Sequence, residues 1–168
     1  MTIDTKERKQ FRPSVCAELG DVNPQHGPNA GRLICQMRTG RENPIYQSES
    51  DDEGKTWTKA YALRWTFSRF GRQREIAGTD PDLIEMSNGI LVMSFGHKPD
   101  YREDGNYLAF SLDHGQSWTQ VTQISSTATS AYTGVREISP GELYVVYSIV
   151  GGVSKYKTMG RGVRVSMP

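Results

Sequence analysis

The sequence is short of the features that mark several large protein classes. It contains only two cysteines, Cys16 and Cys35, and no CxxC pair. Neither a disulfide framework nor a zinc ribbon is supported, and we expect two buried, unreactive thiols. No window approaches the roughly 18 consecutive apolar residues that a membrane-spanning helix needs. Residues 1–13 are charged and carry no apolar core, so we expect no secretory signal in this chain.

The chain also lacks a surplus of charge. Its 20 Lys and Arg residues balance 19 Asp and Glu residues, for a formal net charge of +1. A protein that holds nucleic acid by its phosphates needs a positive field, so we expect no nucleic-acid partner. The 17 glycines, 8 prolines and 8 tyrosines among 168 residues favour turns and strands. Length and composition therefore predict one globular, β-rich domain.

Two eight-residue segments of the sequence match each other closely. Residues 50–57 (SDDEGKTW) and 111–118 (SLDHGQSW) both read S-x-D-x-G-x-[ST]-W. Each lies between two strand-like pieces, which is typical of a hairpin turn. In such a turn the Asp side chain accepts backbone N–H groups, the Gly takes a positive φ, the hydroxyl fastens the turn and the Trp covers it. We therefore assign a structural role to Ser50, Asp52, Gly54, Thr56, Trp57, Ser111, Asp113, Gly115, Ser117 and Trp118.

A second repeat runs in phase with the first. A glycine turn leads into an apolar strand three times, and an apolar piece ending in Glu precedes each turn. The glycines are Gly31, Gly89 and Gly141, and the glutamates are Glu18, Glu85 and Glu137. The unit thus reads strand, Gly turn, strand, loop, strand, Asp turn, strand over about 50 to 60 residues, which is the pattern of a β-propeller blade.

The repeat predicts an all-β fold of about three propeller blades, each a four-stranded antiparallel sheet. We expect the blades at residues 13–60, 80–120 and 130–168, after an N-terminal tail at residues 1–12. The third blade lacks an Asp turn.

The Asp turn on a four-stranded repeat resembles the BNR repeat, or Asp-box, of the sialidase (neuraminidase) superfamily. The likeness covers residues 13 to 167 and implies half of a six-bladed ring, its C-terminal half. An open half would expose two sheet faces. We therefore expect missing N-terminal blades as the partner, with a second half-propeller as the alternative.

The resemblance implies a glycoside hydrolase of the exo-α-sialidase type, acting on sialic acid or a related acidic sugar. It implies a carbohydrate ligand and no cofactor. The alternative is a non-catalytic Asp-box propeller that binds carbohydrate or serves as a structural module, because Asp-boxes are structural.

The resemblance also implies catalytic residues, five positions before each repeated Glu. Those positions hold Pro13, Asp80 and Tyr132. Residues 130–134 (SAYTG) are similar to the sialidase segment that carries a nucleophilic tyrosine, which replaces the usual carboxylate. A phenol, with a pKa of about 10, must lose its proton to a carboxylate before it attacks. The family has a Glu where this chain has Pro13, so Asp80 or Glu18 is left as the activator.

Two arginines resemble members of the triad that grips the sialic acid carboxylate. Arg38 ends the second strand of its blade, and Arg102 precedes the second Asp turn in a register about one residue longer than usual. Guanidinium groups stay charged and bind a carboxylate through two parallel hydrogen bonds. The third arginine and the acid/base Asp of the family belong to blades that this chain does not contain.

A third hypothesis is a related glycosidase that acts on another sugar and uses Asp80 and Asp82 as its carboxylates. The three histidines show no metal-ligand spacing, so we expect no metal site. Because the first strand of each blade lines the central channel, we expect Asp80, Tyr132 and Arg38 on one rim of the half-ring. The Asp turns should lie at its outer edge.

Overall fold

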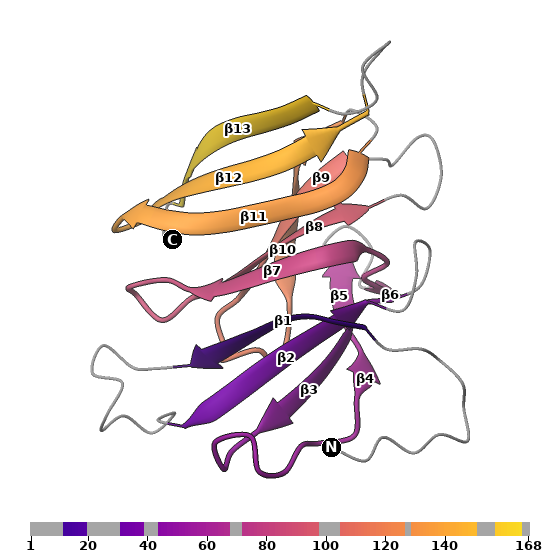
Figure 1. The fold of residues 1–168 in the computed structure, drawn as a ribbon, viewed down its shortest axis with the longest axis vertical. Coiled ribbons are helices and arrows are strands. Elements are labelled where there is room, and N and C mark those ends of the chain that lie inside the picture. The colour runs from indigo at the N-terminus through magenta and orange to yellow at the C-terminus, as the bar shows by residue number, and fades with distance from the viewer. Residues whose placement is uncertain are drawn as a thin grey trace.

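The computed structural model describes residues 12–19, 31–38, 44–67, 72–97, 105–126, 129–150 and 157–165, without the side chains of 12–19, 65–67, 72–74 and 129–131. These residues form strands and turns and contain no helix (Figure 1). None of the described segments is therefore a helix that could cross a bilayer. The all-β prediction is confirmed.

Three antiparallel sheets of three or four strands hold most of the residues that the structure describes, and we call them blades 1, 2 and 3. Blade 1 has the order β1-β2-β3-β4 and blade 2 the order β7-β8-β9-β10. Blade 3 has the order β11-β12-β13. The strands of blade 1 are β1 (Arg12–Leu19), β2 (Arg32–Arg38), β3 (Tyr46–Ser50) and β4 (Tyr61–Ala62). Those of blade 2 are β7 (Thr79–Glu85), β8 (Leu91–His97), β9 (Gly105–Ser111) and β10 (Thr119–Ser125). Those of blade 3 are β11 (Thr129–Ser139), β12 (Glu142–Ile149) and β13 (Lys157–Arg164).

A two-stranded hairpin lies between blades 1 and 2. It consists of β5 (Arg64–Phe67) and β6 (Arg72–Glu75). The buried side chains of Leu63 and Ile76, next to the two strands, join the core between the blades. The repeat pattern predicts no strand at β5 or β6.

The two hydrophobic cores lie between neighbouring blades. The first combines Ile34 of blade 1 with Leu91, Met93 and Phe95 of β8. The second combines the opposite face of blade 2 with blade 3; its members include Val92, Leu108, Val135, Leu143 and Val145. Because successive strand residues point to opposite faces, blade 2 is covered on both sides, as in a propeller.

The expectation of two free thiols is wrong. Cys35 is disulfide-bonded, and Cys16 is the only other cysteine of the sequence. The backbones of residues 16 and 35 face each other in the register of β1 and β2. Cysteine count and spacing gave no sign of this pairing, because it depends on how the two strands align.

Both Asp turns join the third strand of a blade to the fourth. In the first turn, Asp52 accepts the Thr56 backbone N–H at 2.8 Å and the Thr56 hydroxyl at 2.6 Å. The Ser50 hydroxyl accepts the Gly54 N–H at 2.8 Å, and Gly54 has a φ of +82°. The second turn repeats these bonds with Asp113 and Ser117. In both turns, hydrogen bonds among the Ser, Asp, Gly and Ser or Thr residues close the loop between the two strands.

The Asp turns predict a loss of stability in acid. The Thr56 hydroxyl lowers the pKa of Asp52 from 3.8 to about 2. Partial burial raises the pKa of Asp113, but the hydrogen bonds from Ser117 outweigh it and the net pKa is lowered. A carboxyl whose pKa falls on folding stabilises the fold above its unfolded pKa and ceases to do so as the pH drops through its folded pKa.

We therefore expect the free energy of unfolding of Asp52→Asn to lie below that of the wild type at neutral pH. The gap should shrink as the pH falls from about 4 to about 2, measured by urea unfolding along a pH series. A gap that stays constant over this range would show that the carboxylate charge does not hold the turn.

Candidate functional site

The starts of three strands meet at one rim of the blade array. β1, β7 and β11 are the first strands of the three blades, β7 lies beside the other two, and their arrowheads point the same way in Figure 1. The Thr133 hydroxyl, near the start of β11, donates to the carbonyl of Asp80, near the start of β7, at 3.3 Å. The end of β2 reaches the same rim, because Arg38 pairs with Arg12 of β1.

Each of the first strands is bulged close to this rim. The register shifts between Pro13 and Val15 in β1, between Thr79 and Asp82 in β7, and between Thr129 and Thr133 in β11. Bulges re-aim side chains and occur often beside active sites. The three positions that the repeat aligned, Pro13, Asp80 and Tyr132, lie within these bulges or at their edge.

Arg38 and Asp80 form an ion pair at the rim. The Nη1 atom of Arg38 lies 3.0 Å from both carboxylate oxygens of Asp80. Both side chains are partly accessible, at 31% and 22% of their full exposure. Residues from two different blades thus bring a cation and a carboxylate together at a position that solvent can reach.

The backbone of Asp80 is unusual for a residue with a side chain. Its φ of +47° lies in the left-handed region, which Asp tolerates better than most residues. Burial raises the pKa of the Asp80 carboxyl, and the Arg38 guanidinium opposes that rise only in part. A carboxylate with a raised pKa is a stronger base than an ordinary aspartate, and strained backbone is often found at functional sites.

Tyr132 precedes Thr133, the residue of β11 that contacts the backbone of Asp80. The Thr133 hydroxyl donates to the Asp80 carbonyl and accepts from the Ser94 hydroxyl at 3.1 Å. The backbone carbonyl of Tyr132 accepts the Ser148 hydroxyl at 3.2 Å. The Tyr132 side chain is 66% exposed. It therefore points to solvent rather than into a core between blades.

Of the other two candidates, the structure describes the backbone of Glu18 alone. Glu18 pairs with Leu33, while Arg12 pairs with Arg38, so Glu18 lies at the other end of β1, about 20 Å along the strand. Because of that distance we leave Glu18 out of the candidate site. Arg102 lies outside the described residues.

Asp82 holds two blades together. Its Oδ2 atom accepts the Val135 N–H at 2.8 Å and the Arg136 guanidinium at 2.7 Å. A carboxylate oxygen that already accepts two hydrogen bonds from blade 3 has a structural use. The arrangement thus disfavours the hypothesis that Asp80 and Asp82 act as a carboxylate pair.

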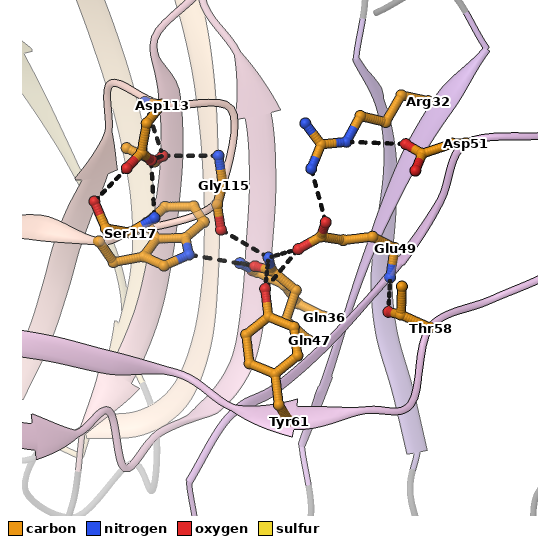
Figure 2. A network of polar contacts seen from close by, with 12 residues as sticks. Arg32, Gln36, Gln47, Glu49, Asp51, Thr58, Tyr61, Asp113, Gly115 and Ser117 are labelled. Carbon is orange, nitrogen blue, oxygen red and sulfur yellow. Dashed lines mark hydrogen bonds and ion pairs between the residues drawn. The ribbon is translucent and has the colours of Figure 1, made fainter.

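A second polar cluster lies between blades 1 and 2 (Figure 2). Glu49 accepts the Tyr61 hydroxyl at 2.5 Å, Gln47 at 2.9 Å and Arg32 at 2.7 Å. Burial, aided by the hydrogen bond to Glu49, raises the pKa of Tyr61. Burial raises the pKa of Glu49 in turn, but the hydrogen bonds that Glu49 accepts outweigh it and lower the pKa.

Gln47 connects this cluster of blade 1 to blade 2 by hydrogen bonds. Its side chain is fully buried; it donates to the Gly115 carbonyl at 2.8 Å and accepts the Trp118 indole N–H at 3.2 Å. Both partners belong to the second Asp turn. The role of Gln47 could not be predicted from the sequence, since a lone glutamine in a strand gives no signal before its partners 68 and 71 residues away are known.

Solved structures resemble this fold at low sequence identity. A Hadza microbial sialidase matches 70% of this chain and 23% of its own, at 20% identity and a TM-score of 0.52. The sialidase NanB of Streptococcus pneumoniae matches 86% of this chain and 20% of its own, at 18% identity and a TM-score of 0.50. A protein of unknown function from Dyadobacter fermentans matches 92% of this chain and 51% of its own, at 16% identity and a TM-score of 0.55.

The chain thus spans about a quarter or less of those two sialidases and about half of the Dyadobacter protein. No protein-family model matches the sequence, and no curated protein matches it. Structural similarity at 16–20% sequence identity is evidence for the fold alone. The fold of this chain is that of a sialidase-like β-propeller, seen in part.

Proposed function

We propose that this chain forms part of a sialidase-like glycoside hydrolase and that its rim binds an acidic sugar. The observation that carries the proposal is the ion pair between Arg38, at the end of β2, and Asp80, in the bulge of β7, close to the bulge of β11 that holds Tyr132. A guanidinium group, a carboxylate with a raised pKa and an exposed phenol are the groups that such chemistry needs.

Each residue has a distinct role in the proposal. Arg38 binds the carboxylate of the sugar, exchanging its contact with Asp80 for one with the ligand. Asp80, released, takes the proton of Tyr132 while the phenol oxygen attacks the anomeric carbon. The glycosidic C–O bond breaks, and a general acid outside this chain protonates the leaving oxygen. Water then hydrolyses the sugar–tyrosine bond, and the proton returns to the phenol.

Tyrosine suits this position for an electrostatic reason. An acidic sugar carries a negative charge at or near its reacting carbon, and a second carboxylate would be repelled from it. A neutral phenol approaches without that cost and becomes charged only as it reacts.

One observation favours a non-catalytic function in place of hydrolysis. Among the described residues, none donates to or accepts from the Tyr132 hydroxyl, and the Asp80 carboxylate is held by Arg38. A rim that binds an acidic sugar without cleaving it needs Arg38 but neither a base nor a nucleophile.

The experiment is a titration of the chain with N-acetylneuraminate and, separately, with its uncharged methyl ester, followed by NMR. We expect the acid to bind and the ester to bind much more weakly. Arg38→Ala should weaken binding of the acid at least about tenfold, since it removes a charged hydrogen-bond pair. Asp80→Asn should strengthen it, because Arg38 then has no competing carboxylate.

Arg164→Ala is the matched control. Arg164 is also paired with a carboxylate, that of Glu142 at 2.6 Å, but it lies on β13. Its removal should leave the affinity unchanged. Equal binding of acid and ester, or an Arg38→Ala variant that binds like the wild type, would refute the proposed carboxylate site.

A further inference from the structure

Asp80 and Asp82 contact different blades although they lie two positions apart on β7. Asp80 pairs with Arg38 of blade 1, whereas Asp82 accepts hydrogen bonds from β11 of blade 3. Successive residues of a regular strand point to alternate faces. The residues after Asp82 follow that rule, since Leu83 packs in the core with blade 1 and Ile84 against the core with blade 3. By the same alternation Asp80 would face blade 3.

The bulge of β7 accounts for the reversal. The register of β7 and β8 passes over residues 80 and 81. Residue 81 is a proline, which has no N–H to donate to a neighbouring strand, and Asp80 has a φ of +47°. A bulge re-aims the side chain that it contains. The Asp80 carboxylate therefore reaches blade 1 because the backbone at Asp80 is left-handed.

The Thr133 hydroxyl holds the backbone of this bulge from blade 3. It lies 3.3 Å from the Asp80 carbonyl oxygen, and the Ser94 hydroxyl of β8 lies 3.1 Å from the Thr133 hydroxyl. A carbonyl oxygen can only accept, so Thr133 donates to Asp80 and accepts from Ser94. The hydrogen bonds thus run in a single direction, from β8 through β11 to the bulge.

Ser94 is placed to fix the direction of the Thr133 hydroxyl. It is the only hydroxyl residue of β8 and has no exposed surface. Its neighbours Met93 and Phe95 belong to the core with blade 1, so Ser94 faces blade 3. A buried hydroxyl is costly unless it is hydrogen-bonded. Because Thr133 accepts the Ser94 proton, the Thr133 proton is directed at the Asp80 carbonyl.

Thr133 also belongs to the segment that carries Tyr132. The carbonyl of Tyr132 accepts the Ser148 hydroxyl of β12 at 3.2 Å. The peptide between Tyr132 and Thr133 is therefore held on one side by β12 and on the other by the bulge of β7. One hydroxyl group thus connects the backbone of the proposed base with the backbone of the proposed nucleophile.

We propose that Thr133, supported by Ser94, is a positioning residue of the rim: its hydroxyl holds Asp80 in the left-handed bulge and so keeps the Asp80 carboxylate on Arg38. A strained backbone persists only where its surroundings fix it. Without the Thr133 hydroxyl the bulge relaxes, and the alternation of β7 turns the Asp80 carboxylate toward blade 3. What the rim binds rests on the proposed function, but the effect of Thr133 on the Arg38–Asp80 contact does not.

The test follows the Arg38 side chain of the purified chain by nitrogen NMR through a pH titration. The Arg38 Nε resonance of the wild type should move as Asp80 ionises, and Asp80→Asn should abolish this step and so assign it. Thr133→Val keeps the shape of the side chain but removes its hydroxyl. We expect the step to shrink by at least about half, since one lost hydrogen bond shifts a two-state population about fivefold. Thr133→Ser restores the hydroxyl and should retain the step.

Thr119→Val is the matched control. The Thr119 hydroxyl also donates to a backbone carbonyl, that of Phe110 at 3.4 Å, but it lies beside the second Asp turn. Its loss should leave the Arg38 step as it is in the wild type. Circular dichroism checks that each variant is folded. A full Arg38 step in Thr133→Val, or a Thr133→Ser variant that loses as much of the step as Thr133→Val, would overturn the proposed role.

Binding of N-acetylneuraminate gives a second measurement. Because Asp80 competes for Arg38 in the proposed function, Thr133→Val should strengthen binding, as Asp80→Asn does. The two changes combined should strengthen it little more than either alone, because they act through the same contact. Weaker binding by Thr133→Val, or effects that add, would indicate a purely structural role for Thr133. If the wild type does not bind the sugar, the proposed function fails, while the Arg38 titration still decides the role of Thr133.

Discussion

Replacement of Trp118 by alanine is expected to lower the free energy of unfolding by about 3–5 kcal/mol. The side chain is 2% exposed and belongs to the core between blades 1 and 2. Its removal leaves a cavity where two sheets meet, and it also deprives Gln47 of a hydrogen bond at 3.2 Å. Urea unfolding followed by circular dichroism measures the loss.

The matched control is the tryptophan at the same place in the other Asp turn. Trp57 is half-buried and donates within its own turn, so Trp57→Ala should cost about 1–2 kcal/mol, in proportion to the smaller area that it covers. If Trp57→Ala proved as costly as Trp118→Ala, the difference in burial between the two tryptophans would not determine the loss.

Trp118→Phe separates packing from hydrogen bonding. Phenylalanine keeps most of the apolar bulk but cannot donate to the buried Gln47. We expect an intermediate loss, which includes the cost of about 1–3 kcal/mol for a buried acceptor that loses its donor. Because Gln36 also donates to the same oxygen, at 3.4 Å, the cost should fall toward the lower end of that range.

The features that the sequence predicted are those with local causes. The Asp turns depend on contacts between residues two to four positions apart, such as Ser50 with Asp52 and Asp52 with Thr56. Eight residues therefore contain the hydrogen bonds that close the turn, and two copies in phase indicate a repeated sheet. The fold class followed from that repeat.

The features that the sequence missed depend on contacts between distant residues. The disulfide bond of Cys35 depends on the register of two strands, and the role of Gln47 depends on a turn in the next blade. The β5–β6 hairpin belongs to no repeat, so no internal comparison could reveal it.

Only part of the candidate site could be predicted from the sequence. Counting from the repeated Glu identified Asp80 and Tyr132 as equivalent positions, and the bulges that both strands share there give this equivalence a structural basis. The same count could not show that Arg38 holds the Asp80 carboxylate, 42 residues away. The count also kept Glu18 as a candidate, although Glu18 lies five positions after Pro13, toward the other end of β1.

Replacement of Gly115 by alanine should cost about 2–5 kcal/mol, well above the cost at another glycine with the same backbone. Gly115 has a φ of +87° and Gly89 a φ of +82°, so each substitution carries about 1–2 kcal/mol of left-handed strain. At Gly89 a new Cβ meets nothing within 4 Å, but at Gly115 it would lie 2.4 Å from Cδ1 of Ile34. Ile34 is fully buried between the blades, so it cannot move aside freely, and overpacking adds about 1–3 kcal/mol. Urea unfolding of the two variants measures the difference; equal losses would mean that the second Asp turn does not press against blade 1.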